Sequence, residues 1–215
     1  MHADAEREKR LAAEAAAALV EDGMTLGLGT GSTASHFLTA LAARNLDLRC
    51  VATSPATERS ALALGLRVES FDDTDALPRL DLAVDGADQI GPERWIVKGG
   101  GGAHTREKIV GAAAARFVVI ASSDKIVEHL DPPVALELLE FGLAATLERL
   151  EHARLRDAPS TPDGGVLADW FGPVDDPRGL AARLDATPGV VDHGLFAPEL
   201  ISEVIIGRED RVERL

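Results

Sequence analysis

The chain has 215 residues, of which 46% are hydrophobic and 27% are charged, and its formal net charge is −14. This composition is typical of a folded globular protein with one or two domains and a substantial core, not of a disordered chain. The acidity argues against general nucleic-acid binding, because such binding needs a basic surface that neutralises phosphates.

The first part of the chain alternates between helical and strand patterns. Helices are expected at residues 5–21, 35–44, 57–64 and 106–116, and short strands at residues 24–28, 48–52, 66–70, 80–84, 94–97 and 117–121. Short apolar strands separated by helices indicate a parallel sheet that is covered on both faces. In such sheets ligands bind beyond the carboxyl ends of the strands. The loops at residues 29–33, 53–55 and 85–88 all fall at such ends.

The single cysteine, Cys50, lies in the predicted strand at residues 48–52, where we expect a buried and unreactive thiol. One cysteine leaves no internal disulfide, which fits a reducing cytosol. Residues 1–18 are rich in alanine but interrupted by charges, and no uncharged stretch approaches the ~20 apolar residues of a membrane span. We therefore expect a cytoplasmic protein with no membrane partner.

The pattern changes after the Asp-Pro-Pro sequence at residues 131–133. We expect in turn a helix at 135–150, a strand at 152–156, a turn at 159–165, a strand at 166–170, a helix at 175–185 and a last strand near 201–206. This order is typical of a small α+β unit that follows the parallel-sheet part.

A glycine-rich loop, Gly-Leu-Gly-Thr-Gly-Ser-Thr-Ala at residues 27–34, links the first strand to a helix. Glycines let the backbone approach a ligand, and the hydroxyls of Ser32 and Thr33 lie near a helix N-terminus that favours anions. The loop also meets the loose dinucleotide pattern, but the next strand ends in Val-Ala-Thr, where a dinucleotide site has an acid. We therefore favour a phosphate loop over an NAD site, with a tight capped turn as the structural alternative.

Two acids, a lysine and four glycines follow one another between residues 85 and 102. Asp85 and Asp88 come after an apolar strand, and the pair fits either a turn or a site. Lys98 precedes four consecutive glycines, whose N–H groups can surround developing negative charge. A flexible lid is the alternative. Together these groups suit carbonyl–enolate chemistry on a small polar substrate.

The helix after the glycines carries an early acid, Glu107, which helix-dipole effects alone would explain. His104 is a lone loop histidine that we expect to be solvated, and no histidine pair has metal-ligand spacing. Lys9 and Lys125 are expected to be surface charges, because most lysines are exposed.

Four motifs, in this order and spacing, resemble ribose-5-phosphate isomerase type A: Gly-Thr-Gly-Ser-Thr-Ala, Asp-Gly-Ala-Asp, Lys-Gly-Gly-Gly and Thr-Arg-Glu-Lys. The likeness covers most of the chain, including residues 188–196. It implies that ribose 5-phosphate and ribulose 5-phosphate are interconverted through a cis-enediolate, in the non-oxidative pentose phosphate pathway, without a metal or an organic cofactor. The small-molecule partner is thus a sugar phosphate.

The resemblance also implies an α/β fold and a homodimer or homotetramer. A Rossmann-like domain, residues 1–130 plus 205–215, would carry a smaller inserted α+β domain of residues 131–204. Glu107 matches the general base, Lys98 the group that stabilises the enediolate oxyanion, and Asp85 an acid associated with ring opening. The substrate-binding set comprises Asp85 and Lys98 together with Lys9, Thr30, Gly31, Ser32, Thr33, Gly86, Ala87, Asp88, Gly99, Gly100, Gly101 and Lys125.

The second half departs from the family pattern at three places, all expected to lie away from the chemistry. Residues 161–165 read Thr-Pro-Asp-Gly-Gly, residues 133–136 lack a glutamate often found there, and Glu140-Phe141 replaces a Pro-Phe step. A non-catalytic sugar-phosphate sensor of related fold would need the phosphate loop but not Glu107 and Lys98 together. An amino-sugar-phosphate deaminase is a further alternative, and a dinucleotide oxidoreductase a poor third.

Overall fold

The computed structural model describes residues 2–72, 77 and 79–215. These residues form two compact units. The first contains the described residues of Met1–Ala87, Arg106–Lys125 and Glu199–Leu215, and the second contains Asp88–Thr105 and Ile126–Pro198. The chain therefore passes from one unit to the other inside the Asp-Gly-Ala-Asp motif. Among the described residues, no helix is long and apolar enough to cross a membrane.

The first unit is built on a six-stranded sheet with the order β13-β12-β6-β3-β1-β2. Its strands are β1 (Thr25–Leu28), β2 (Arg49–Ala52), β3 (Leu80–Asp85), β6 (Ala114–Ser122), β12 (Glu203–Arg208) and β13 (Arg211–Arg214). Every neighbouring pair is parallel except β12 and β13. The predicted parallel sheet is therefore confirmed. The strand expected at residues 66–70 is reduced to a single bridge between Cys50 and Val68.

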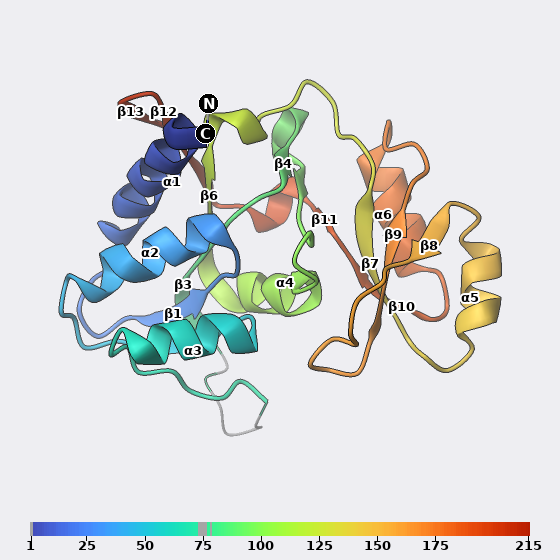
Figure 1. Cartoon of the computed structure of the whole chain (residues 1–215), viewed down its shortest axis with the longest axis horizontal. Helices are drawn as coiled ribbons and strands as arrows, with labels where there is room; N and C mark the ends of the chain where they lie inside the picture. Colours follow the sequence, from blue (N-terminus) through green and yellow to red (C-terminus); the bar gives the residue numbers. More distant parts are fainter. Residues whose placement is uncertain (1, 73–76, 78) are drawn as a thin grey trace. The chain divides into compact units, whose positions relative to one another are not determined.

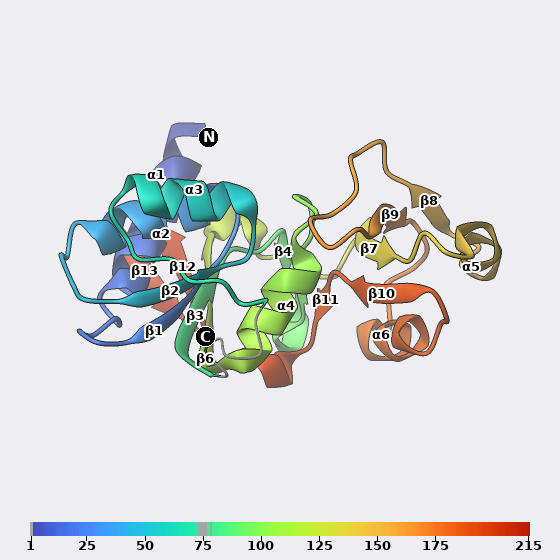
Figure 2. The same ribbon diagram turned by 90° about the horizontal axis from the view of Figure 1, so that it is seen from below.

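Helices cover both faces of this sheet, and their placement follows from alternating side chains along the strands. Figure 1 and Figure 2 show α1 (His2–Ala17), α2 (Ser32–Ala42) and α3 (Pro55–Ala63) on one side of the sheet. Leu26 and Leu28 of β1 pack on this side with Phe37 of α2. Gly27 faces the other side, where a Cβ would lie 2.3 Å from Val110 of α4 (His104–Ala113). Glycine at this position lets α4 approach β1 closely.

Cys50 of β2 is fully buried in the core between this sheet and its helices. Burial, with a smaller contribution from Glu69, raises the pKa of the Cys50 thiol to about 12. The expected buried thiol is confirmed, and at neutral pH it is protonated and therefore a poor nucleophile.

The second unit contains a four-stranded antiparallel sheet with the order β10-β7-β9-β8 and a three-stranded sheet with the order β11-β5-β4. The strands are β4 (Gln89–Ile90), β5 (Ile96–Val97), β7 (Val134–Leu138), β8 (Ala153–Leu155), β9 (Val166–Trp170), β10 (Val190–His193) and β11 (Leu195–Phe196). The helices are α5 (Leu143–Arg149) and α6 (Pro177–Asp185), and single turns of 3-10 helix lie at η1 (Pro92–Arg94), η2 (Ser123–Lys125) and η3 (Pro198–Leu200). η2 belongs to the first unit, and η3 begins with the last residue of the second unit and continues into the first.

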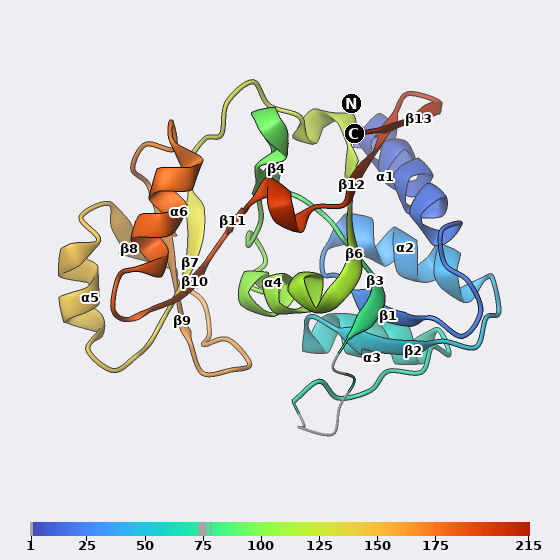
Figure 3. The ribbon, with the colours of Figure 1, turned by 180° about the vertical axis from the view of Figure 1, so that it is seen from behind.

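One face of the four-stranded sheet is covered by α6, as Figure 3 shows. Leu180 and Leu184 of α6 pack there with Leu136 of β7 and Trp170 of β9. The opposite face carries Glu137 and Asp169, which alternate with these apolar residues along β7 and β9.

The prediction of a helix at residues 135–150 is wrong. The structure has β7 in its first part and α5 only after Gly142, which has a φ of 76°. Alanine, leucine and glutamate favoured a helix by intrinsic propensity. However, β7 lies between β10 and β9, and all five of its residues are buried. Burial on both faces of a central strand overrides such propensity.

Candidate active site

Three loops meet at one edge of the six-stranded sheet, as expected. Strands β3, β1 and β2 are parallel neighbours and end at Asp85, Leu28 and Ala52. Parallel strands have their carboxyl ends at the same edge, so the segments that follow these three residues lie beside one another. The predicted convergence of these loops is confirmed.

The glycine-rich loop that we predict to bind phosphate leads directly into α2, which begins at Ser32. Gly31 is the N-cap with a φ of 116°, and no side chain caps the helix there. A glycine N-cap leaves the first N–H groups of the helix open to an anion. Ser32 is exposed while Thr33 is buried, and a Cβ on Gly86 would lie 3.8 Å from Cβ of Thr33. The end of β3 is therefore in van der Waals reach of the phosphate loop.

Thr30 shapes this loop through its side chain. Its hydroxyl lies 2.8 Å from the Thr53 hydroxyl, 2.9 Å from that of Ser54 and 3.0 Å from that of Thr57. These three residues belong to the segment that follows β2, so the hydroxyl network ties two strand-end loops together. The N–H of Thr30 donates to Oδ1 of Asp85 at 3.1 Å.

Asp85 is held in place by backbone groups and by a close contact. It is 2% exposed, and its Oδ1 also accepts the N–H of Gly86 at 2.7 Å. A Cβ on Gly29 would lie 2.2 Å from the Asp85 carboxyl carbon. Any side chain at residue 29 would collide with the Asp85 carboxylate, so glycine is needed there for Asp85 to contact this loop. The spacing of glycines in the sequence did not predict this contact.

In the second unit, Lys98 follows β5 and is 4% exposed. Its N–H donates to the carbonyl of Gly194 at 2.8 Å. Its Nζ lies 5.6 Å from the ring centroid of Phe196 in β11, which pairs with β5. A cation over an aromatic face is attracted to the ring. Residues 188–196, noted as part of the family resemblance, thus include a residue that positions Lys98.

The glycines after Lys98 serve two different purposes. Gly99 and Gly102 have φ values of 101° and 75°, and a Cβ on either would lie 2.6 Å from a side-chain carbon of Ala135 or Leu167. These two glycines let the loop lie against β7 and β9, on the face opposite α6. Gly100 is exposed and donates its N–H to Oδ2 of Asp88 at 2.8 Å. The loop is packed and hydrogen-bonded, unlike a flexible lid.

The start of α4 is more buried than we expected. His104, expected to be solvated, is 0% exposed, which corrects that expectation. The hydroxyl of Thr105 donates to Glu137, a buried acid of β7 that also accepts the Thr161 hydroxyl at 2.6 Å. The loop at residues 161–165 was expected to lie away from the chemistry, but it is linked through Glu137 to the first turn of α4. Glu107 lies in that same turn and is 5% exposed.

The two lysines assigned to the phosphate lie in the first unit. Lys9 has its Nζ 2.6 Å from Glu6, and hydrogen bonds from Lys9 and His36 lower the pKa of Glu6 to about 2. Lys125 ends the 3-10 turn η2. This turn is held by Glu8, whose Oε2 accepts both the N–H and the hydroxyl of Ser123 at 2.9 and 2.8 Å. Glu8 was not singled out from the sequence.

Glu8 should therefore stabilise the fold in a pH-dependent way. Burial alone would raise the pKa of Glu8, but hydrogen bonds from Glu209 and Ser123 outweigh it and lower that pKa. The stabilisation is present above the unfolded-state pKa of about 4.3 and is lost as pH falls through the lower folded-state value. We expect Glu8→Gln to lower the free energy of unfolding by about 2 kcal/mol at pH 7.

Urea unfolding at pH 7 and at pH 3 measures this effect. The loss caused by Glu8→Gln should be smaller at pH 3, which lies below the unfolded-state pKa, so that the unfolded chain is protonated at this residue and the advantage of the lowered folded-state pKa is reduced. Glu14→Gln, on an exposed position of the same helix, is the control and should change stability by less than about 0.5 kcal/mol. An equal loss at both pH values for Glu8→Gln would contradict the role of its charge.

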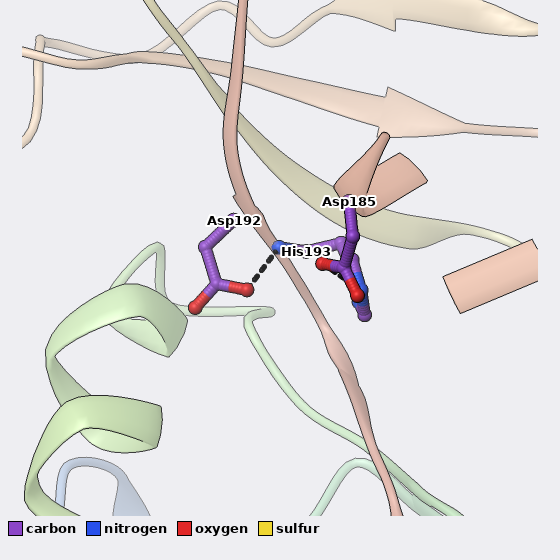
Figure 4. Close-up of side chains that lie close together, drawn as sticks. All are labelled: Asp185, Asp192 and His193. Carbon is purple, nitrogen blue, oxygen red and sulfur yellow. Dashed lines mark hydrogen bonds and ion pairs between the residues drawn. The ribbon is translucent and has the colours of Figure 1, made fainter. Parts of the chain in front are cut away.

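A cluster of metal-ligand residue types lies elsewhere, at Asp185, Asp192 and His193 in the second unit (Figure 4). Nδ1 of His193 accepts the N–H of Leu195 at 3.2 Å, and Nε2 lies 3.1 Å from Oδ1 of Asp185. Asp192 accepts the backbone N–H of His193 at 2.7 Å, and its carboxylate points away from the ring. A neutral imidazole has one acceptor nitrogen, and here Nδ1 is already used. The cluster therefore does not present a ligand set to a metal.

Each unit thus brings together part of the predicted site. The first unit holds the phosphate loop, Asp85 with Gly86, and Glu107 in α4. The second holds Asp88, Lys98 and the glycine loop. The residues missing from the prediction are those that hold these groups, above all Glu137, Phe196 and Arg156, whose Nη1 donates to the carbonyl of Gly99 at 3.0 Å.

A family model described as ribose 5-phosphate isomerase A (phosphoriboisomerase A) matches residues 49–211. The chain belongs to the ribose 5-phosphate isomerase A family. A ribose-5-phosphate isomerase A of Caulobacter sp. (strain K31) is 45% identical over 226 residues, which cover 98% of each chain. The family resemblance inferred from the four motifs is therefore confirmed.

Solved isomerases of this family share the fold over nearly the whole chain. The ribose 5 phosphate isomerase A from Neisseria gonorrhoeae has a TM-score of 0.90 at 30% identity, covering 98% of this chain and 96% of its own. A D-ribose-5-phosphate isomerase in complex with phospho-erythronic acid has a TM-score of 0.89 at 33% identity, covering 98% of each chain. The predicted α/β class, a mostly parallel sheet with separate small antiparallel sheets, is confirmed.

Proposed function

We propose that the protein interconverts ribose 5-phosphate and ribulose 5-phosphate by moving one proton between C1 and C2 through a cis-enediolate. Ribose-5-phosphate isomerase activity follows from family membership, because relatives named for it match 98% of the chain at 45% identity. One observation supports the assignment of roles: Asp85, Lys98 and Glu107 are 2%, 4% and 5% exposed. Ionisable side chains are rarely this buried unless they are paired or belong to a functional site.

Glu107 acts as the general base in this proposal. On the open-chain aldose, its carboxylate takes the proton from C2, and the electron pair forms the C1–C2 double bond while the carbonyl oxygen gains negative charge. The same carboxylic acid then returns the proton to C1, and the hydroxyl proton of O2 moves to O1, which leaves the ketose. A base with a matched pKa accelerates such transfers by about 10²–10⁴-fold.

Lys98 and the N–H groups of the glycine loop stabilise the charge that develops on the enediolate oxygens. Donors that are already in place need no rearrangement as the charge forms, which is why they are effective. Gly99, Gly100 and Gly101 present backbone to the substrate without side chains. Asp85 acts earlier, as the acid associated with opening of the furanose ring.

The substrate phosphate is bound at residues 30–33, at the start of α2, with Lys9 and Lys125 as cations. A net charge of −14 repels anions at long range, so the helix N-terminus and the lysines must attract the phosphate locally. Asp88, with Gly86 and Ala87 beside it, binds sugar hydroxyls. The complex of a 33%-identical isomerase with phospho-erythronic acid, a sugar-acid phosphate, supports a ligand of this class.

We also expect a homodimer or homotetramer in the cytoplasm. The expected oligomer follows from the family resemblance. The expected location follows from the single cysteine, which is buried and free. Sedimentation equilibrium would measure the oligomer directly.

The activity is tested with purified protein, ribose 5-phosphate and EDTA, with no added cofactor. We expect ribulose 5-phosphate to form until equilibrium is reached, as followed by the absorbance of the ketose. Ribose without phosphate should react far more slowly, because phosphate binding holds the reacting carbons in place. A folded sample that leaves ribose 5-phosphate unchanged would overturn the proposal.

A further inference from the structure

Arg156 follows β8 in the second unit and uses both sides of its guanidinium. Nε donates to Oδ2 of Asp169 at 3.0 Å, and Nη2 donates to the other carboxylate oxygen. Nη1 donates to the carbonyls of Gly99 and Gly100 at 3.0 and 3.3 Å. The side chains of Arg156 and Asp169 are 21% and 16% exposed, so this network is shielded from solvent. Asp169 thus anchors the guanidinium that holds the glycine loop.

The two carbonyl contacts determine where the following N–H groups point. In a trans peptide the C=O and the N–H point in opposite directions. With both carbonyls turned toward Arg156, the N–H groups of Gly100 and Gly101 are directed away from it. The N–H of Gly100 does meet Asp88 Oδ2 on that side, and a Cβ on Gly101 would meet no heavy atom within 4 Å. The N–H of Gly100 is thus taken by Asp88, and the N–H of Gly101 is directed away from Arg156, which contacts the carbonyls.

The carbonyl of Gly99 also accepts the N–H of Gly102 at 3.0 Å, so it is held by the turn as well as by Arg156. The carbonyl of Gly100, in contrast, accepts a hydrogen bond from Arg156, and the next residue, Gly101, has no neighbour that would restrict its backbone through a side chain. Without Arg156 the carbonyl of Gly100 loses this contact, and the glycines on both sides allow the peptide between Gly100 and Gly101 to turn. The loop would then keep its packing against Ala135 and Leu167 but lose the orientation of its exposed peptide groups.

We propose that Arg156 is a positioning residue for the isomerisation: through the carbonyl of Gly100 it orients the peptide group whose N–H belongs to Gly101, so that this N–H and Lys98 face the charge of the enediolate. This inference rests on the proposed function, because it assigns an orientation to the donors named there. A lysine cannot replace Arg156, since an ammonium is a point donor that cannot bind a carboxylate on one side and two carbonyls on the other.

The test compares Arg156→Lys with Arg154→Lys, a change two residues earlier, on β8, where the guanidinium lies 5.9 Å from the Phe171 ring centroid. We expect Arg156→Lys to reduce kcat by about 10- to 100-fold, part of the loss caused by removing a whole oxyanion donor. Its KM should change by less than about threefold, since the phosphate loop is untouched. Arg154→Lys should keep both constants within about twofold of the unmodified enzyme.

The Ki values of two inhibitors distinguish a loss of donor orientation from a general disturbance of the binding site. Phospho-erythronic acid carries a carboxylate besides its phosphate, and its Ki should rise about tenfold in Arg156→Lys, a loss of one charge-assisted hydrogen bond. The Ki of inorganic phosphate should stay within about twofold. A parallel rise of both Ki values, or a kcat within about twofold of the unmodified enzyme, would overturn the inference.

Two further outcomes are distinguishable from these. If the unmodified enzyme does not isomerise ribose 5-phosphate, the proposed function fails, and with it the premise for Arg156. If Arg156→Lys does not fold by circular dichroism, Asp169→Asn replaces it: this variant keeps Arg156 but weakens its anchor, and it should lower kcat without changing the Ki of phosphate. An active, folded Asp169→Asn variant with unchanged kcat would then contradict the inference.

Discussion

Replacing Glu107 by glutamine is expected to reduce kcat for ribose 5-phosphate by about 10²–10⁴-fold, which is the contribution of a positioned general base. Glutamine keeps the size of the side chain but cannot accept the C2 proton. Binding of inorganic phosphate should be unchanged, because the phosphate loop and Glu107 lie in different segments of the first unit. Steady-state kinetics and the Ki of phosphate measure both effects.

Glu58→Gln is a matched control, since Glu58 also lies in the first turn of a helix, α3, and is exposed. If Glu107 served only the helix dipole, the two substitutions would have similar small effects on stability and none on kcat. An activity of Glu107→Gln within a few-fold of the unmodified enzyme would place the base elsewhere. Loss of phosphate binding together with activity would instead indicate damage to the fold.

Replacing Lys98 by methionine is expected to reduce kcat by about 10²–10³-fold, the usual loss when one donor to a developing oxyanion is removed. Methionine has a similar length and can contact the Phe196 ring through its sulfur. Lys98 is 4% exposed, so a side chain of similar size is needed to fill its place without leaving a cavity. The expected result is a loss of activity in a variant that still folds.

Lys108→Met on α4 is the control for this substitution, because Lys108 is a partly buried lysine outside the proposed site. Its kcat should remain within about twofold. A Lys98→Met variant that melts well below the unmodified chain would mean that Lys98 stabilises the fold, and retained activity would mean that the oxyanion is stabilised by other groups. Thermal melting followed by circular dichroism and initial-rate assays distinguish these results.

Much of the fold was predictable because local patterns and tertiary structure agree in the first unit. Short apolar strands followed by glycine loops and helices produced the parallel sheet, and the loops after β1, β2 and β3 meet at one edge as expected. The strand at residues 66–70 was over-predicted, since only Val68 forms a bridge to Cys50.

The second unit was less predictable because burial opposes local propensity there. Residues 134–138 have helix-favouring side chains but lie in the centre of an antiparallel sheet. The same error hid Glu137, which a helix would have placed among surface acids. Its partners Thr105 and Thr161 are 32 and 24 residues away in the chain, and no local pattern links them.

The sequence by itself determined the family, the α/β class and the order of the acids, the lysine and the glycines, because these depend on residue types at short spacing. Tertiary structure decided what holds them: Gly29 lies against Asp85, Phe196 lies under Lys98, and Arg156 orients the glycine peptides from 57 residues away. The physical reason is that the direction of a backbone carbonyl or a buried carboxylate is decided by its partners in space. Those partners come from strands and loops that only the folded chain brings together.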